Sequence, residues 1–346
     1  MTSKPQIWLH LFPVPGRCID QAVWAESVGF DGVLLADSET LVGDPFVELA
    51  MISRSTTRLG LGTGVVNPVT RHAAVVAAAA ATLHRESGGR AALGIGRGDS
   101  ALSRVGLAQP TTAQLFAFVR DVRAYLHGEP VITASGSSQL AWLEAGAAPP
   151  PVEVAATGPK TIALAATIAD RPMLTIGADP KRIAAGIDAA RAARRAAGLD
   201  ANDMRIGAYL NVACHNDAAT ARDLVRGSAA IFARFSSRSR SRHADPGNPD
   251  DAVIRELVRT YDPARHGETA IAHARSLPDD FVDRFAVVGP PTTCIDRINE
   301  LIDLGLDRIV VVPGSRDADP AVLDQSNAMF AEQVLPHLAD RAAPRS

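Results

Sequence analysis

The sequence predicts a (β/α)8 barrel with insertions, the largest of them between the seventh and eighth strands. Eight short apolar segments read as buried strands, and helical patterns separate them. Most of these units have the length of one strand and one helix, which favours a closed barrel over an open doubly wound sheet. We therefore expect a single domain over residues 1–346, with its chemistry at the carboxyl ends of the strands.

Each strand is predicted where a short apolar run ends in glycine or in polar residues. The last strand lies in LIDLGLDRIVVVPG, which repeats the order of helix, capping glycine, apolar residue, aspartate and strand seen earlier in SVGFDGVLLAD. This repetition supports the count of eight. The predicted strands are residues 7–12, 33–36, 59–64, 91–96, 152–156, 173–176, 205–213 and 308–312.

Capping residues mark several helix boundaries. Gly29 supplies a left-handed cap at the end of the first helix, and Asp44 with Pro45 opens the second. Residues 128–151 are rich in Gly, Ala, Ser and Pro, and they predict a long surface loop. The other predicted helices are an alanine-rich one after residue 71 and those at 112–127, 161–169 and 180–197.

The interval 215–285 holds far more than one helix. We expect it to form a partly helical flap over the mouth of the barrel. It contains the basic run RFSSRSRSRH at residues 234–243. This run fits a solvated loop, and it also fits a flap that contacts an anion.

The composition describes a globular chain without a strong electrostatic field. Of its 346 residues 47% are hydrophobic, the formal charge is -3 and the pI is near 6.3. Nothing in this balance draws the chain to nucleic acid or to an anionic membrane. The cysteines are far apart, we see no signal peptide, and the longest apolar tract, 73–83, is too short to span a bilayer. We expect a cytoplasmic protein.

Familiar catalytic and nucleotide motifs fail when they are tested on this chain. GIGRGDS at 94–100 has Asp99 where the dinucleotide fingerprint needs glycine, and it follows the fourth predicted strand. GDSAL at 98–102 lacks the second glycine of a serine-hydrolase elbow, and no GK dipeptide exists for a phosphate-binding loop. The histidines form no HExxH motif and no cluster with cysteine, so we expect no bound metal.

Glycines and polar side chains remain at the strand ends. The polar ones include Asp37, Asn67, Arg97 and Asp99. Such a site suits a planar cofactor that brings its own reactivity, because glycine lets the backbone approach a ring or a phosphate closely. The segment Thr157-Gly158-Pro159 opens a helix whose free amides favour a phosphate, although ordinary helix capping explains it equally well.

Seven segments that span almost the whole chain carry a family resemblance. They are LADSETLVGDPFVELA, GTGVVNPVTRH, SGGRAALGIGRGDSALSRVGL, AATGPKTIALAA, ARFSS, YDPARHG and DRFAVVGPP, in that order. Together they resemble the bacterial luciferase-like superfamily, and within it the oxidoreductases that depend on the deazaflavin coenzyme F-420 and are similar to methylenetetrahydromethanopterin reductase. Each segment is weak alone, and their shared order makes a chance match improbable.

This resemblance implies a TIM barrel with the deazaflavin ring across the carboxyl ends of the strands. It also implies a cis peptide bond at Gly64-Val65, beneath the ring. The expected cofactor contacts combine the residues that the resemblance implies with the polar residues at the strand ends. They are Asp37, Ser38, Gly62, Thr63, Gly64, Val65, Asn67 and Arg97. The expected phosphate-binding segment comprises Thr157, Gly158, Pro159 and Gly177.

The chain also departs from its relatives. Many of them have a histidine after the strand-two aspartate, where this chain has Ser38, so a histidine base is absent there. We expect Asp99 to act as a general acid or polar anchor; a salt bridge to Arg97 or Arg104 is the alternative. Arg265 and His266 are expected to close over the substrate, with capping and surface packing as their alternative. Helix capping alone is an adequate role for Arg71 and Lys160.

The leading hypothesis is an F-420-dependent oxidoreductase that moves a hydride between the deazaflavin C5 and a small organic substrate. Reduction of an imine, enone or carbonyl is expected, since the usual histidine base is missing. An FMN-dependent luciferase-like monooxygenase is the first alternative, and a catalytically silent flavin-binding member is the second. The resemblance also implies a homodimer.

Overall fold

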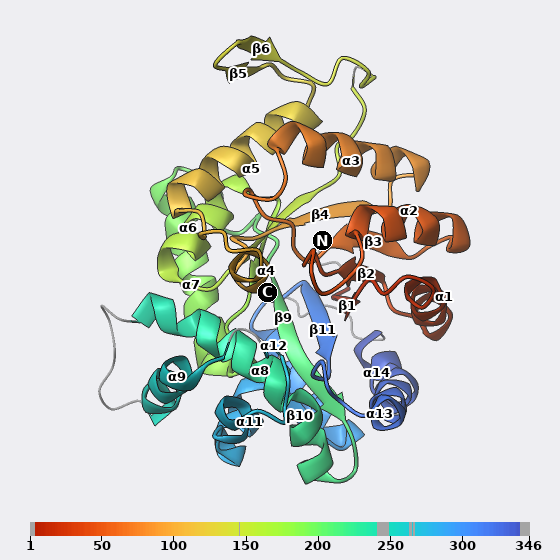
Figure 1. Ribbon diagram of the computed structural model, residues 1–346, viewed down its shortest axis with the longest axis vertical. Helices are drawn as coiled ribbons and strands as arrows, with labels where there is room; N and C mark the ends of the chain where they lie inside the picture. Colours follow the sequence, from red (N-terminus) through yellow and green to blue (C-terminus); the bar gives the residue numbers. More distant parts are fainter. Residues whose placement is uncertain (1–3, 145, 241–248, 263–264, 266, 340–346) are drawn as a thin grey trace.

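Eight parallel strands close into a barrel, which confirms the predicted fold class. The computed structural model describes residues 4–144, 146–240, 249–262, 265 and 267–339 (Figure 1). Strand β9 closes the barrel because it pairs with both β8 and β11. The barrel strands, in order around it, are β1 (Gln6–Leu11), β2 (Gly32–Leu35), β3 (Gly60–Thr63), β4 (Ala91–Ile95), β7 (Val152–Ala156), β8 (Arg171–Leu174), β9 (Gly207–Cys214) and β11 (Arg308–Pro313).

Helices cover the outside of the barrel (Figure 1). Asp44 accepts hydrogen bonds from the first turn of α2 and precedes a proline, and Gly29 ends α1 with a φ of 101°. Both predicted caps are therefore confirmed. None of the helices in the described ranges is long and apolar enough to cross a membrane. The helices outside the largest insertion are α1 (Cys18–Val28), α2 (Pro45–Ser55), α3 (Ala73–Glu86), α4 (Ser100–Arg104), α5 (Thr112–Leu126), α6 (Pro159–Ile168), α7 (Pro180–Ala196), α12 (Pro291–Asp303), α13 (Pro320–Gln333) and α14 (Leu335–Ala339).

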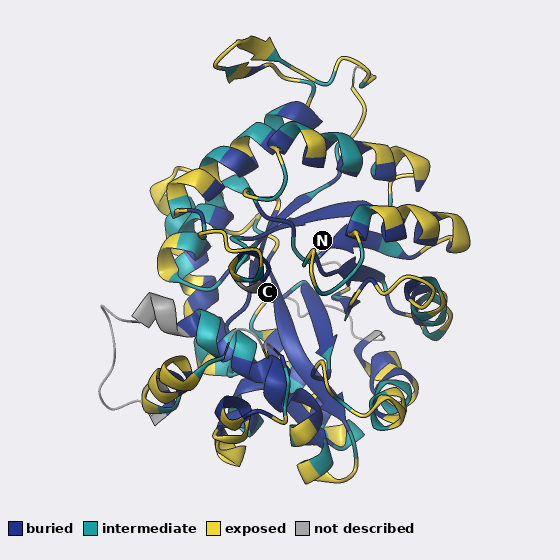
Figure 2. Ribbon diagram, in the orientation of Figure 1, coloured by how far each residue is buried: buried dark blue, intermediate teal, exposed yellow. Residues whose placement is uncertain are grey.

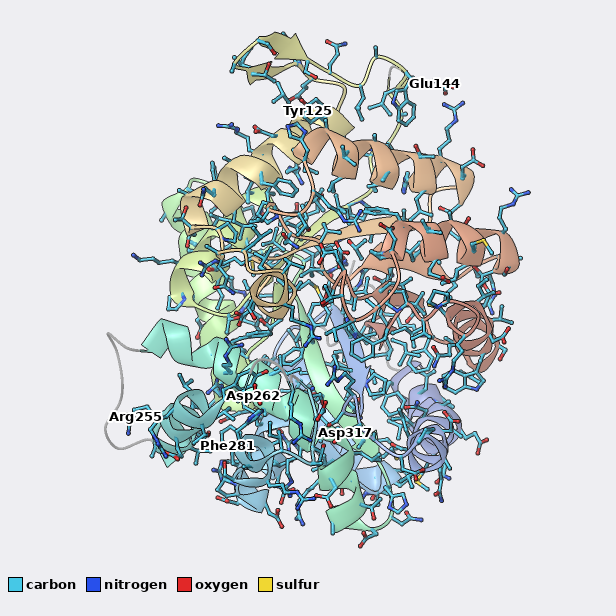
Figure 3. The ribbon with its side chains drawn as sticks, viewed as in Figure 1. Tyr125, Glu144, Arg255, Asp262, Phe281 and Asp317 are labelled. Carbon is cyan, nitrogen blue, oxygen red and sulfur yellow. The ribbon has the colours of Figure 1, made fainter. Side chains whose placement is uncertain are left out.

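The largest insertion lies between β9 and β11, as predicted, and is mostly helical. Its helices share an apolar core that includes the fully buried Phe281, which is labelled in Figure 3. Residues 234–240 of the basic run belong to a helix, so a loop is the wrong interpretation for them; 241–243 lie outside the described residues. The apolar face of this helix packs on the core of the insertion, and the helix extends from there into the basic run. These helices are α8 (Ala218–Arg240), α9 (Pro249–Thr260), α10 (Ala272–Arg275) and α11 (Asp279–Phe285).

Two short pairings were not predicted. Strand β10 (Val287–Gly289) runs parallel to the last residues of β9, and three residues are too few to show a sequence period. Strands β5 (Val131–Thr133) and β6 (Gly136–Ser138) form an antiparallel hairpin inside the predicted loop, and the hairpin projects from the barrel (Figure 1). The sequence GSS of β6 carries no apolar side chain, so it gave no strand signal.

The barrel strands form the buried centre of the molecule, and the exposed residues lie on the outer helix faces, on the β5–β6 hairpin and in loops (Figure 2). Trp8 fills the barrel near the amino-terminal ends of the strands, where a Cβ atom at Gly32 would lie 2.5 Å from its ring. Arg308 stacks on Trp8 at 4.0 Å and, with Arg171, donates to the fully buried Glu153. The amino-terminal end of the barrel is thus filled by side chains, which leaves the carboxyl end for a site.

Candidate functional site

A cavity of about 680 Å³ opens at the carboxyl ends of the strands. Its wall includes the residues that follow β2, β3, β4, β7, β8 and β11, and helix α8 of the insertion forms one side. This is the face where parallel barrels carry their chemistry. The cavity is also large enough for a planar cofactor and a small substrate together.

Nine residues of the predicted site line this cavity. They are Asp37, Ser38, Gly64, Val65, Arg97, Asp99, Thr157, Gly158 and Pro159. Four others are absent from its wall, namely Gly62, Thr63, Asn67 and Gly177. Arg265 is exposed and pairs with Glu268, while His266 lies outside the described residues.

The glycines of β4 make room for the segment that follows β3. A Cβ atom at Gly94 would lie 2.0 Å from the Thr63 carbonyl oxygen, and one at Gly96 would lie 2.5 Å from a methyl group of Val65. The Thr63 hydroxyl in turn donates to the Gly94 carbonyl oxygen over 2.8 Å. The GIG motif therefore serves strand packing, while Gly96 also reaches the cavity wall.

The peptide bond Gly64-Val65 is cis, which confirms the expectation drawn from the resemblance. Its two residues form part of the cavity wall. Asn67 organises the turn that follows, because its side chain accepts from the Val69 and Thr70 amides at 3.0 and 3.1 Å. Asn67 thus stabilises the turn beside the cavity and does not line the cavity itself.

Gly62 and Gly177 also pack against protein atoms. A Cβ atom at Gly62 would lie 2.6 Å from a methyl group of Leu34. Gly177 has a φ of 83°, and a Cβ atom there would lie 2.7 Å from the Phe285 ring. The close approach that requires glycine at these two positions is to neighbouring protein atoms, which at Gly62 include the Ala92 carbonyl oxygen at 2.8 Å.

Asp37 is held by an arginine from the loop after β3. Arg71 donates to both Asp37 carboxylate oxygens over 2.8 and 3.0 Å, and also to Asp44 over 2.9 Å. The hydrogen bond to Asp37 raises the pKa of Arg71, so the guanidinium stays charged. The helix-capping role considered for Arg71 is wrong, because its side chain joins the strand-two loop to the start of α2.

Ser38 lines the cavity, and its hydroxyl is buried without a protein partner. Its Oγ is enclosed and makes no hydrogen bond with any of the described residues. A buried hydroxyl in this state costs free energy until it is paired. A bound molecule can pair this hydroxyl once the side chain turns toward the cavity.

Helix α6 begins at the opposite part of the wall. Gly158 is its N-cap and provides no side-chain cap, and Pro159, Lys160 and Thr161 follow along the cavity. Next to it, the Thr157 and Thr175 hydroxyls lie 2.7 Å apart. Amides at such a helix start, with a lysine beside them, suit a phosphate group.

Asp99 forms an ion pair with the insertion. Its Oδ2 accepts from Arg234 of α8 over 3.1 Å, and the Arg234 guanidinium lies 4.3 Å from the centre of the Tyr261 ring. The two paired side chains are only 9% and 12% exposed, so water screens them weakly. Arg97 instead donates to the Pro110 carbonyl oxygen and Arg104 to the Thr40 hydroxyl.

Several lining residues were missed by the sequence analysis. His10 and Tyr209 lie at the floor, Phe232 and Phe235 of α8 form part of the side wall, and Arg316 pairs with Glu268 at the rim. The register of the first strand could have placed His10 on the inner face of the barrel, because His10 alternates with Trp8 in β1 and with Phe12 just after it. The α8 residues depend on where the insertion packs, which no local pattern reveals. No group of three metal-ligating side chains is present within the described ranges.

The sequence profile of the family described as luciferase-like monooxygenase matches residues 2–308, so the chain belongs to this family. It is 31% identical to 5,10-methylenetetrahydromethanopterin reductase of Methanolobus tindarius over 83% of this chain and 86% of the relative. It is 28% identical to an F-420-dependent glucose-6-phosphate dehydrogenase of Nakamurella multipartita over 94% and 93%. These oxidoreductase relatives confirm the resemblance drawn from the seven segments.

The fold also matches solved structures. An F-420-dependent secondary alcohol dehydrogenase, solved with an F-420-acetone adduct, superposes with a TM-score of 0.74 at 20% identity. The match covers 98% of this chain and 100% of that one. At this identity the likeness concerns the fold, and it agrees with the barrel described above.

Proposed function

We propose that the protein is an F-420-dependent oxidoreductase that transfers a hydride between the deazaflavin and a small organic substrate. The observation that carries this proposal is the cavity itself, with an unpartnered Ser38 hydroxyl in one part of its wall and the uncapped start of α6 in another. These features fit the two ends of a long, flat cofactor that carries a phosphate. The relatives named above support the choice of F-420.

In this proposal the chain holds the cofactor with few side chains. Gly64 and Val65 would lie against the ring, Ser38 would form one hydrogen bond at its edge, and Gly158 and Thr161 would offer backbone amides to the phosphate, since all five residues line the cavity. The bound deazaflavin would supply the hydride chemistry at its C5. The protein would contribute alignment and the exclusion of water.

The flap over residues 215–285 forms the substrate side of the site in this proposal. Phe232 and Phe235 of α8 give that side an apolar surface, and Asp99 lies at the contact between α8 and the loop after β4. With its carboxylate paired to Arg234, Asp99 acts as the polar anchor of this contact and of the substrate. Arg265 then has a structural role at the rim, through Glu268.

An FMN-dependent monooxygenase is the second candidate. The description of the matching family as luciferase-like monooxygenase supports it. FMN also carries a flat ring and a phosphate, so the same two features of the cavity suit it. A homodimer, a cytoplasmic location and a single domain stay predictions.

The two cofactors are separated by one pair of titrations. Purified protein is titrated with F-420 and with FMN, and the oxidation of each reduced cofactor is then followed in air and with imine, enone and carbonyl acceptors. We expect tighter binding of F-420 and oxidation that requires the organic acceptor. Tight FMN binding with oxygen consumption contradicts the proposal, and cofactor binding without any turnover supports a catalytically silent flavin-binding member.

A further inference from the structure

His10 lies at the cavity floor and takes no part in the cofactor and substrate contacts proposed so far. It projects inward from β1 and is half-buried between the rings of Phe12 and Tyr209, at centroid distances of 5.8 and 6.1 Å. Its Nε2 lies 2.8 Å from the Gly64 carbonyl oxygen. It therefore touches the segment that we propose lies against the cofactor ring.

The Gly64 contact fixes the tautomer of this imidazole. A carbonyl oxygen only accepts, so Nε2 must carry the proton and donate it. Nδ1 then has a lone pair in the neutral ring. It has no hydrogen-bond partner among the described residues, and it is not one of the enclosed unpartnered atoms. His10 thus offers the cavity one proton acceptor whose orientation is set by the protein.

The surroundings of His10 keep the ring neutral. Burial lowers the pKa of His10, and the hydrogen bond to Gly64 opposes this only in part. From β9, Tyr209 contributes a neutral hydroxyl, because burial raises the pKa of that phenol. The cavity carboxylates of Asp37 and Asp99 are each held by an arginine. The other charged lining residues are Arg97, Lys160 and Arg316.

We propose that His10 is a catalytic base, and that the substrates of this enzyme form an alcohol and carbonyl couple. This inference rests on the proposed function and narrows its substrate class. In the oxidation direction the carbon–hydrogen bond of the alcohol breaks and its electron pair leaves with the hydrogen to the deazaflavin. The oxygen–hydrogen bond breaks, its proton goes to Nδ1, and the carbonyl double bond forms. In reduction the imidazolium returns that proton.

The pH dependence follows with a definite sign. Oxidation needs neutral His10, so its kcat is retained near pH 7 and falls as the pH drops through the lowered pKa of His10, below 6.5. Reduction needs the protonated ring, so its kcat falls as the pH rises through the same pKa. A residue with a merely structural role would not give opposite limbs in the two directions.

The test uses His10→Gln, because the glutamine amide can still donate to Gly64 but cannot accept a proton as a base. The matched control is His84→Gln: His84 is also half-buried, has a pKa lowered by burial and lies 3.3 Å from the Ala91 carbonyl oxygen, but it is absent from the cavity wall. The probes are F-420 with 2-propanol, cyclohexanol, acetone and cyclohexanone. Thermal melting verifies that each variant is folded.

For His10→Gln we expect an F-420 affinity within threefold of wild type, a kcat lowered about 10²- to 10⁴-fold in both directions, and loss of the opposing pH limbs. His84→Gln should match wild type. In the protein without cofactor, nitrogen-15 NMR of His10 should show the Nε2–H tautomer and a pKa below 6.5.

Four results would contradict the proposal in whole or in part. One is F-420 binding with near-normal kcat and intact pH limbs in His10→Gln, which leaves the proposed function standing. Another is an NMR spectrum that shows the Nδ1–H tautomer. Wild-type protein that binds no F-420 removes the proposed function together with this inference, and wild-type protein that binds F-420 but turns over none of the four probes contradicts the alcohol and carbonyl couple alone.

Discussion

At the scale of single residues, Ser38 and Asp99 carry opposite kinds of polar group. The Ser38 hydroxyl is enclosed without a partner, whereas the Asp99 carboxylate is committed to Arg234. A group without a partner is available to a ligand, and a paired one holds structure in place. The two residues should therefore respond differently to substitution.

Removal of the Ser38 hydroxyl should weaken cofactor binding and spare the fold. We expect Ser38→Ala to raise the Kd for F-420 about three- to tenfold, which corresponds to one net hydrogen bond of about 0.5–1.5 kcal/mol. Its melting temperature should equal or exceed that of wild type. The control is Ser53→Ala, whose hydroxyl donates to the Ala50 carbonyl oxygen away from the cavity. An unchanged Kd in Ser38→Ala would show that this hydroxyl does not contact the cofactor.

Asp99→Ala should impair turnover more than cofactor binding. Its loss leaves Arg234 without this carboxylate and loosens the contact between α8 and the loop after β4. We expect kcat to fall at least about tenfold with a Kd for F-420 within threefold of wild type. Asp283→Ala, which breaks the Arg222 pair within the insertion, is the matched control. Wild-type turnover in Asp99→Ala would remove this residue from the mechanism.

At the scale of elements, the glycines of β4 are set by the shape of the neighbouring segment. The sequence placed strands β3 and β4 side by side and predicted polar residues after each. It could not predict that Gly94 faces a carbonyl oxygen and Gly96 faces Val65, since these contacts depend on the path of the chain after Thr63. The glycines therefore correctly predicted that another group comes close to the backbone here. That group is neighbouring protein, and the predicted ring or phosphate was the wrong partner.

Gly94→Ala should destabilise the barrel far more than an exposed glycine substitution. The new Cβ atom would meet the Thr63 carbonyl oxygen at 2.0 Å, so β3 and β4 must separate, and we expect a loss of about 3 kcal/mol or more in the free energy of unfolding. Gly106→Ala meets no atom within 4 Å and carries only the strain of its φ of 72°, about 1 kcal/mol. Denaturant unfolding measures both. Equal losses would contradict this account of the GIG motif.

At the scale of the whole molecule, the barrel and the position of its open face followed from periodicity and from turn residues. Those signals are local, and each strand end could be located within a few residues. The contacts that connect distant segments were not predictable, as Asp99 with Arg234 and Asp37 with Arg71 illustrate. A charged residue has many possible partners in the sequence, and only the packed fold selects one.

The helical insertion shows the same limit on a larger scale. Its extra length predicted a flap, but the composition of residues 215–285 gave no indication that α8 would bring Phe232 and Phe235 to the cavity. His10 was overlooked for a different reason, since a histidine in a strand is more often a packed core residue than a base. Its inward register alone could not distinguish the two roles.

Hydride transfer between the deazaflavin and an organic carbon can be followed with an isotope label. F-420 reduced and deuterated at C5 is mixed anaerobically with the protein and an acceptor that the wild-type enzyme reduces, and the product is analysed by mass spectrometry and NMR. We expect one deuterium on the electrophilic carbon of the acceptor. A product without deuterium at that carbon, or turnover only when oxygen is admitted, would contradict it.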